Sequence, residues 1–307
     1  MTAFVADGDG HTIRSVDVGT GRVTTIAGSG AAGYGDGVGP AAVFSSPIDI
    51  DATPDGSTLL ICDYNNRRIR KLDLASGTVS TLAGSGAAAL ADGTGAAAAF
   101  NIPHGVAVAP DGLTAVVADF GNHRLRLIVL ASQVVTTIAG SGVGGSVDGI
   151  GTTAQLNHPT YVAFTPDGQT LLICDQAGHR VRAMTVSSRS VWTLAGSGGA
   201  GYADGVGTLA SFNMPYGVAV TPDGAYALIG QYMDHRVRAI DLSTRAVTTL
   251  AGSSAGHADG SGSDARFNNP AQPAVSPDGK TMLIADLTNH RVRKIDLCPV
   301  KVRRCAW

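Results

Sequence analysis

The hydrophobic and polar positions of this chain repeat with a fixed period. Residues 27–30, Ala-Gly-Ser-Gly, return at 83–86, 139–142 and 195–198, and again at 251–254 with Ser in the last place, so every interval is 56 residues. A period held this rigidly indicates an array of equal structural units. The elements predicted for one unit therefore apply to the others.

Each period predicts four short strands, as its second copy illustrates. Residues 47–52 alternate between apolar and polar side chains, and residues 58–63 are apolar almost throughout. Residues 67–74 alternate again, and residues 78–84 are rich in β-branched side chains, which favour strands. Gly, Pro, Asn and Asp residues separate the four segments, as tight turns require. Four short antiparallel strands at this spacing are typical of one blade of a β-propeller.

A long loop fills the rest of each period. It is rich in Gly, carries an Asp-Gly pair and ends with an aromatic residue or Leu shortly before a Pro. Loops of this length need an anchor of their own. We therefore expect the aromatic residue or Leu to pack beneath the loop; these anchors are Phe44, Phe100, Leu156, Phe212 and Phe267.

The number of copies predicts the number of blades. The segment that leads into the third strand occurs six times, at 7–14, 63–70, 119–126, 175–182, 231–238 and 286–293. The prediction is an all-β, six-bladed β-propeller built of four-stranded antiparallel blades, a single domain over residues 1–307. The blades are expected at about 2–28, 29–84, 85–140, 141–196, 197–252 and 253–307.

The two ends of the array are expected to differ from its middle. The first strand of the repeat occurs only five times, starting near Pro47, Pro103, Pro159, Pro215 and Pro270. The first blade is therefore predicted to lack its innermost strand, and residues 300–305 are the candidate fourth strand of the last blade. An open ring would expose unpaired backbone. Three arrangements could cover this backbone. The missing strand could come from a longer chain, from the C-terminal tail of this chain, or from a second copy that donates a strand.

One segment carries a specific family resemblance. Residues 122–125, Asn-His-Arg-Leu, and 289–292, Asn-His-Arg-Val, each follow an Asp-ended strand and a Pro-Asp-Gly turn. In this they resemble NHL repeats, which are named after Asn, His and Leu positions. The resemblance covers essentially the whole chain and implies a six-bladed β-propeller.

Composition excludes some classes of partner. The net charge is -2, and all 24 acidic residues are Asp, so no strong field draws the chain to nucleic acid or to an anionic membrane. No apolar run approaches the ~20 residues of a membrane span. Some NHL propellers bind single-stranded RNA, but here the arginines are spread evenly over the repeats, and RNA binding needs clustered basic and aromatic residues. Nucleic acid is therefore not expected as a partner.

The four cysteines fall into two pairs. Cys62 and Cys174 occupy the same place in two repeats, where other repeats have Ala or Gly, so they are predicted to be buried core thiols. Cys298 and Cys305 have no counterparts and are a candidate disulfide. Such a bridge would suit an oxidising compartment and slightly favours an extracellular or cell-surface location.

Residues present in every repeat are interpreted as architecture. Asp63 ends a second strand, and Arg68 and Arg70 share one face of the third, which predicts a partly buried ion pair or an Asp-capped turn in each blade. The repeated histidines lie on different blades and do not converge on one metal unless they face the axis. The Asp-Gly pair of each loop supplies one carboxylate, too few for calcium, and is interpreted as a turn.

Residues that depart from their counterparts are the functional candidates. Most follow the Pro that starts the first strand, at the expected mouth of the axial channel, and they are interpreted as one concave, partly aromatic ligand site. The alternative is that they fill a narrow channel. The candidates are Asp49, His104, Tyr161, Tyr216, Gln272 and, from the turn of the fifth blade, Tyr232.

The residues at these positions differ from those of two enzyme families with a similar fold. Peptidyl-amidoglycolate lyases resemble this chain in fold and bind zinc at the axis through several histidines; here only His104 stands at such a position. Calcium-dependent lactonase propellers rely on Glu, which this chain lacks. No catalytic residue, metal or cofactor is therefore predicted.

The leading hypothesis is a non-catalytic NHL-repeat propeller. It would act as a binding or structural scaffold for a protein partner, or assemble with copies of itself through the incompletely closed ring. The alternative is a small-molecule site, or a metal-dependent lyase or hydrolase, at the channel mouth.

Overall fold

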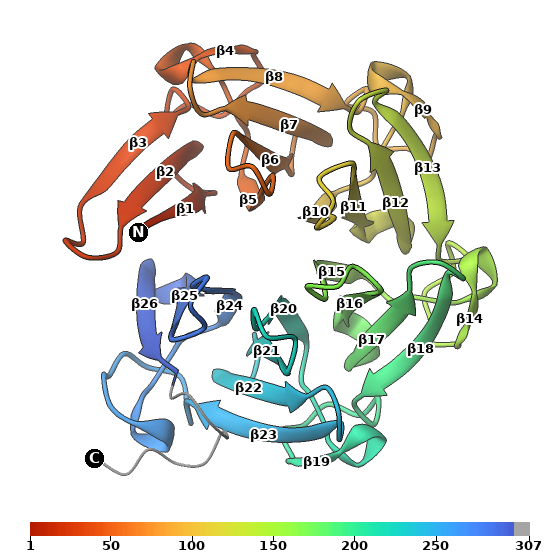
Figure 1. The fold of residues 1–307 in the computed structure, drawn as a ribbon, viewed down its shortest axis with the longest axis vertical. Coiled ribbons are helices and arrows are strands. Elements are labelled where there is room, and N and C mark those ends of the chain that lie inside the picture. Colours follow the sequence, from red (N-terminus) through yellow and green to blue (C-terminus); the bar gives the residue numbers. More distant parts are fainter. Residues whose placement is uncertain (298–307) are drawn as a thin grey trace. The chain divides into compact units, whose positions relative to one another are not determined.

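The computed structural model describes residues 1–297. The chain forms two compact units, Met1–Val143 and Gly144–Trp307. Each unit contains three antiparallel sheets, numbered here as blades 1 to 6 in chain order (Figure 1). Strands and short 3-10 turns are the regular elements of the described residues. The chain is an all-β, six-bladed β-propeller, as its repeats predict.

The first unit holds blades 1, 2 and 3. Blade 1 has the strand order β1-β2-β3, blade 2 the order β4-β8-β7-β6-β5, and blade 3 the order β10-β11-β12-β13-β9. The strands are β1 (Thr2–Asp7), β2 (Thr12–Asp17), β3 (Val23–Ala27), β4 (Gly37–Val38), β5 (Pro47–Ala52), β6 (Thr58–Asp63), β7 (Arg68–Asp73), β8 (Thr78–Ala83), β9 (Gly93–Thr94), β10 (Pro103–Val108), β11 (Thr114–Asp119), β12 (Arg124–Val129) and β13 (Val134–Ala139). Its 3-10 turns are η1 (Gly39–Ala41), η2 (Gly95–Ala97) and η3 (Phe120–Asn122).

The second unit holds blades 4, 5 and 6, with the orders β14-β18-β17-β16-β15, β19-β23-β22-β21-β20 and β24-β25-β26. The strands are β14 (Gly149–Ile150), β15 (Pro159–Phe164), β16 (Thr170–Asp175), β17 (Arg180–Thr185), β18 (Ser190–Ala195), β19 (Gly205–Val206), β20 (Pro215–Val220), β21 (Tyr226–Gln231), β22 (Arg236–Asp241), β23 (Ala246–Ala251), β24 (Pro270–Val275), β25 (Thr281–Asp286) and β26 (Arg291–Asp296). Its 3-10 turns are η4 (Gly151–Thr153), η5 (Gln176–Gly178), η6 (Gly207–Leu209), η7 (Gly262–Asp264) and η8 (Leu287–Asn289). Cys298, Cys305 and the candidate fourth strand at 300–305 lie outside the described residues.

The long loops contain more structure than their sequence predicts. In blade 2 the loop supplies β4, a two-residue strand that pairs Gly37 with Val79 and Val38 with Thr78. Blades 3, 4 and 5 repeat this arrangement with β9, β14 and β19. These four blades therefore have five strands rather than the predicted four, because the loop covers part of the outer edge of the fourth strand.

The cores lie between consecutive blades of one unit. Ile13 of blade 1 packs in one cluster with Leu59 and Ile61 of blade 2, and Cys174 of blade 4 packs with Val218 of blade 5. Cys62 and Cys174 are free thiols with no exposed surface, as predicted. The loop anchors are buried as well; they are Phe44, Phe100, Leu156, Phe212 and Phe267.

Candidate functional site

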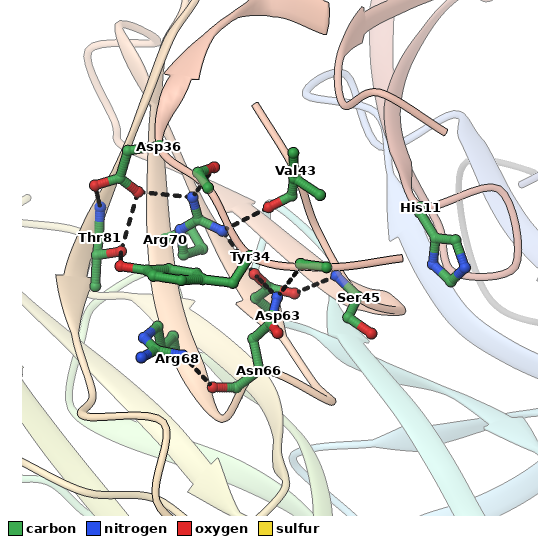
Figure 2. A network of polar contacts seen from close by, with 12 residues as sticks. His11, Tyr34, Asp36, Val43, Ser45, Asp63, Asn66, Arg68, Arg70 and Thr81 are labelled. Carbon is green, nitrogen blue, oxygen red and sulfur yellow. Dashed lines mark hydrogen bonds and ion pairs between the residues drawn. The ribbon is translucent and has the colours of Figure 1, made fainter. Parts of the chain in front are cut away.

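The repeated Asp and Arg form one buried cluster in each of blades 2, 3 and 4. Figure 2 shows the cluster of blade 2. In blade 2, the Arg70 guanidinium has no exposed surface and donates from Nη1 to Asp63 Oδ2 at 2.7 Å. Its Nη2 donates to Asp36 Oδ1, also at 2.7 Å. The predicted ion pair is therefore present. Asp36, interpreted from the sequence as a turn residue, is in addition the second carboxylate partner of the buried arginine.

Main-chain groups complete this cluster. Arg70 also donates to the carbonyl oxygens of Gly35 and Val43, and Asp63 Oδ1 accepts the amide of Ser45 at 2.8 Å. All these acceptors except Asp63 belong to the long loop. A buried ion pair contributes little net stability by itself, so its main effect here is to fix the loop to the blade.

The repeated histidines join consecutive blades. His11 has a left-handed backbone, and its Nδ1 accepts the amide of Ser46, the residue before Pro47, at 3.1 Å. His179 and His235 accept the amides of Met214 and Asn269 in the same way, at 3.2 and 3.1 Å. Each of these imidazoles therefore holds the start of the next blade's first strand.

The candidate positions after each Pro coincide with β-bulges. The register of the first strand shifts between Pro103 and Gly105 in blade 3, and between Pro215 and Gly217 in blade 5. Comparable shifts occur in blades 2, 4 and 6. A bulge leaves a residue unpaired in the ladder and can redirect its side chain. His104 and Tyr216 occupy such unpaired places.

In the first unit, Asp49 has a packing role. It is 5% exposed, and its Oδ2 accepts the amide of Val106 on β10 at 2.8 Å. Asp51, two residues along the same strand, accepts the amide of Val108 at 2.7 Å. Burial raises the pKa of Asp49 well above its usual value and that of Asp51 to about 6, although these amide bonds oppose the shift. Both carboxylates tie blade 2 to blade 3.

His104 lies within an aromatic group of the first unit. Its ring centroid is 5.9 Å from that of Tyr64, edge to face, and 5.5 Å from that of Phe120. Burial lowers the pKa of His104 to about 3, so this imidazole is neutral near pH 7. Tyr64 and Phe120 were not among the sequence candidates. Each follows the Asp that ends a second strand, the same place that singled out Tyr232.

Three tyrosines form the aromatic group of the second unit. Tyr161 on β15 and Tyr216 on β20 have ring centroids 5.4 Å apart at an angle of 46°. Tyr216 and Tyr232 stack at 5.0 Å and 24°. Tyr161 is buried, whereas Tyr216 and Tyr232 are half-buried. The structure therefore brings three sequence candidates into one group.

Gln272, in contrast, is used between strands. Its Oε1 accepts the amide of Val218 on β20, and its Nε2 donates to the carbonyl oxygen of the same residue, both at 3.1 Å. Thr160 makes a comparable link, since its Oγ1 donates to the carbonyl oxygen of Tyr216 at 2.7 Å. For Gln272, as for Asp49, the geometry favours the packing interpretation.

Blade 5 departs from the repeated cluster by exchanging two groups. Gln231 stands in place of the strand-ending Asp, and Asp234 in place of the amide residue three positions later, Asn66 in blade 2. Gln231 Oε1 accepts from Arg238 Nη1 at 2.9 Å, as Asp63 does from Arg70. Gln231 Nε2 donates to Asp234 Oδ2 and to the carbonyl oxygen of Gly201. The fold therefore keeps the hydrogen bonds while carboxylate and amide change places.

Within residues 1–297, no three His, Cys, Asp or Glu side chains gather closely enough to hold a metal ion. In the same part of the chain, no helix is long and apolar enough to cross a membrane.

Two family models match the chain. One, described as "Lactonase, 7-bladed beta-propeller", matches residues 130–301, more than half of the 307 residues. The other, the NHL repeat, matches residues 100–126, which include the Asn-His-Arg-Leu segment. The chain belongs to the lactonase and NHL-repeat propellers. The NHL resemblance predicted from the sequence is thus confirmed, with six blade sheets where the lactonase description counts seven.

Named relatives of this lactonase and NHL-repeat propeller are longer proteins. Protein SUPPRESSOR OF QUENCHING 1, chloroplastic, of Arabidopsis thaliana is 27% identical over 288 residues, which are 90% of this chain and 27% of that protein. NHL repeat-containing protein 2 of Bos taurus is 27% identical over 281 residues, 80% of this chain and 38% of that protein. This chain therefore spans between a quarter and two fifths of the length of these two relatives.

A solved structure shows the same fold. The crystal structure of an auxiliary nutrient binding protein from Bacteroides thetaiotaomicron matches with a TM-score of 0.71 at 18% identity. The match covers 95% of this chain and 65% of that protein. At this level of identity the likeness concerns the fold of the propeller.

Proposed function

We propose that this NHL-type propeller is a non-catalytic binding scaffold, and that it holds a protein partner at the ends of its first strands. The observation that carries the proposal is the aromatic grouping at the bulged positions. His104 lies with Tyr64 and Phe120 in the first unit, and Tyr216 lies with Tyr161 and Tyr232 in the second. Tyrosine supplies a large apolar face and a polar tip, and it is enriched at protein interfaces.

The roles of the polar candidates support a scaffold rather than an enzyme. Asp49 and Gln272 each bind main-chain groups of a neighbouring first strand. A general acid or base must be within hydrogen-bond reach of the substrate, whereas these side chains are engaged in joining blades. The rigidity that they supply keeps the aromatic groups in place.

The free edge of strand β1 in the first blade favours a scaffold that assembles with copies of itself. In blades 2 and 3 the second strand, β6 or β11, pairs with a first strand; in the described residues β1, the corresponding strand of blade 1, pairs only with β2. An unpaired strand edge is a template for a strand from another molecule. A second copy of this chain is the occupant that we propose for this edge.

Light scattering tests this assembly. The weight-average mass should rise above the 31.0 kDa of one chain as concentration increases. A charge on an edge strand opposes pairing, so Thr2→Lys should lower the mass at each concentration. The control Thr20→Lys adds the same charge at an exposed position within the turn between β2 and β3. A mass that stays at 31.0 kDa at the highest concentration would refute self-assembly.

The second candidate function is a small-molecule site in the second unit. It is supported by the lactonase family model, whose match at 130–301 includes the three tyrosines of the aromatic group, Tyr161, Tyr216 and Tyr232. Assays against a panel of lactones test it, with Tyr216→Leu as the variant. Turnover by the wild type that Tyr216→Leu abolishes would favour this candidate over the scaffold, and absence of turnover would count against it.

A further inference from the structure

The Asp-Gly pair of the long loop binds two strands of its own blade at once, as Figure 2 shows for blade 2. Asp36 Oδ1 accepts from Arg70 Nη2 on β7 and from Thr81 Oγ1 on β8, at 2.7 and 3.1 Å. Asp36 Oδ2 accepts the Thr81 amide at 3.3 Å, and Gly37 pairs with Val79 on β8. One dipeptide therefore covers both the arginine of the third strand and the outer edge of the fourth strand.

Blades 3, 4 and 5 repeat this contact. In each of them the arginine of the third strand pairs with the loop carboxylate at 2.7 or 2.8 Å; the pairs are Arg126–Asp92, Arg182–Asp148 and Arg238–Asp204. A threonine hydroxyl of the fourth strand donates to the same carboxylate, from Thr137, Thr193 and Thr249. The valine that the loop covers in blades 2 to 5 is at most 1% exposed; these residues are Val79, Val135, Val191 and Val247.

Blade 1 keeps the residues that receive the loop. Arg14, Val23 and Thr25 stand 56 residues before the arginine, valine and threonine of blade 2. Within residues 1–297, however, no loop covers them. The Arg14 side chain is 40% exposed, Val23 is 47% exposed, and Thr25 is exposed as well. Blade 1 therefore presents the receiving surface of the repeat without an occupant from the described part of the chain.

The uncovered polar groups of blade 1 are hydrogen-bond donors. Arg14 donates from Nη1 to Asp7 at 3.1 Å, and within residues 1–297 no acceptor meets its Nη2. Arg14 and Thr25 are register partners, as are Arg70 and Thr81, so the Thr25 amide faces the outer edge as the Thr81 amide does. A carboxylate is the group that accepts from a guanidinium and from amide and hydroxyl donors together.

We propose that β2 and β3 of blade 1 form a docking site for an Asp-Gly segment of a partner protein. The carboxylate of the segment accepts from Arg14 and Thr25, and the residues after it pair with the edge of β3 at Val23. This is binding by strand addition, in which main-chain bonds give affinity and a side-chain contact gives specificity.

A separate protein, rather than a second copy of this chain, is the source of the segment. In blades 2 to 6 the Asp of each long loop is already paired with the arginine of its own blade. This inference goes beyond the proposed function, because the site lies at the outer edge of blade 1. Self-assembly is proposed at the opposite edge of the same sheet, on β1.

A synthetic peptide tests the chemistry of the site. The probe is the loop of blade 2, residues 31–44, labelled with fluorescein, and its binding to the wild-type protein is followed by fluorescence polarisation. Binding should be saturable. The same peptide with Asp36→Asn should bind at least about tenfold more weakly, because its hydrogen bonds to the guanidinium lose their charge. Equal binding of the two peptides, or no binding of the Asp peptide, would overturn the proposal.

Two protein variants locate the site. Arg14→Met should weaken binding of the Asp peptide about tenfold or more, and Thr25→Val about threefold. Because Thr25 is exposed, Thr25→Val tests the site without disturbing the Asp7–Arg14 pair. The control Lys71→Met removes one positive charge from an exposed position on β7 and should leave binding unchanged. Unchanged binding in Arg14→Met or Thr25→Val, at an unchanged melting temperature, would contradict the proposal.

Light scattering separates the partner protein from a second copy. Arg14→Met should have the same mass as the wild type at each concentration. If Arg14→Met lowers the mass as Thr2→Lys does, a second copy is the occupant and a partner protein is refuted as the source. If the wild type stays at 31.0 kDa while the peptide binds as expected, self-assembly fails and the docking site stands. If the wild type assembles but no peptide binds, self-assembly stands and the docking site is refuted.

Discussion

Blades 2 and 5 solve the same structural problem with different chemical groups. In blade 2 a buried arginine, Arg70, has two carboxylate partners, and one of them, Asp63, is fully buried. In blade 5 the corresponding Arg238 has one carboxylate partner, Asp204, and one amide partner. The difference shows that each blade keeps the same hydrogen-bond donors and acceptors around its arginine, whereas the position of the carboxylate can change. A residue that differs from its counterparts in other blades, such as Gln231, therefore has to be interpreted together with the residue that it contacts, here Asp234.

Removing the two arginines should give the largest contrast. Arg70→Met leaves the buried Asp63 carboxylate without its cation and should lower the free energy of unfolding by about 3–5 kcal/mol. Arg238→Met leaves a buried neutral amide instead and should cost about 1–3 kcal/mol. Urea unfolding followed by circular dichroism measures both values. Equal losses in the two blades would contradict the comparison.

Exchanging the groups back tests whether Gln231 and Asp234 act as a pair. Gln231→Asp alone places two carboxylates together and removes the donor to Gly201, so it should destabilise by about 1–3 kcal/mol. The double variant Gln231→Asp/Asp234→Asn recreates the blade 2 arrangement and should recover most of that loss. The coupling energy from the double-mutant cycle is expected to be about 1–2 kcal/mol. A coupling near zero would show that the exchange is incidental.

A smaller change in the free energy of unfolding is expected at the residue before the first Pro of a blade. In blades 3 and 6 this position has the same backbone conformation but a different residue. Ile102 before Pro103 has φ +59°, and Asn269 before Pro270 has φ +58°. A β-branched residue is strained in this left-handed conformation, which Asn tolerates. Ile102→Asn should therefore raise the free energy of unfolding by about 1 kcal/mol. Asn269→Ile should lower it by more than this amount, because the Asn269 side chain also donates to the carbonyl oxygen of Tyr232 and accepts from Thr288 Oγ1. A stabilising Asn269→Ile would contradict the argument.

The carboxylates between blades 2 and 3 should give an effect that depends on pH. The pKa of Asp51 is about 6 in the folded protein and about 3.8 as a free side chain. The folded state therefore binds more protons between these values, and this contribution to stability is present at low pH and lost as pH rises through 6. The melting temperature of the wild type relative to Asp51→Asn should fall by about 2–4 °C between pH 4.5 and pH 7.5. If the melting temperatures of the wild type and Asp51→Asn change in parallel with pH, the raised pKa of Asp51 is refuted.

The sequence predicts well what repeats locally. The 56-residue spacing, the alternation within strands and the Asp-Gly turns give the blades, because these features depend on neighbouring residues. The candidates Tyr161, Tyr216 and Tyr232 follow from the same internal comparison, since each departs from its counterparts at one place in the repeat.

Side-chain partners far apart in the chain could not be predicted. Asp36 meets Arg70 from 34 residues away, and no local pattern distinguishes that role from a turn. The role of Gln231 is hidden for the same reason, since it depends on Asp234, Gly201 and Arg238 together. The need for Gly at 198 is another case. A Cβ there would overlap the guanidinium of Arg180, which lies 18 residues earlier in the chain.

The histidine links described above constrain how this gene can change length. Within each unit, the imidazoles of His11, His179 and His235 bind the amide that precedes the next blade's first Pro, 34 or 35 residues downstream. Recombination between two repeats that removes or adds one whole period would preserve the distance between each histidine and its acceptor site. Between His235 and Asn269 the interval is one residue shorter and the bond is kept, so the loop absorbs a single-residue change in length. Unequal crossing-over in register, by one whole period, leaves each of these links intact.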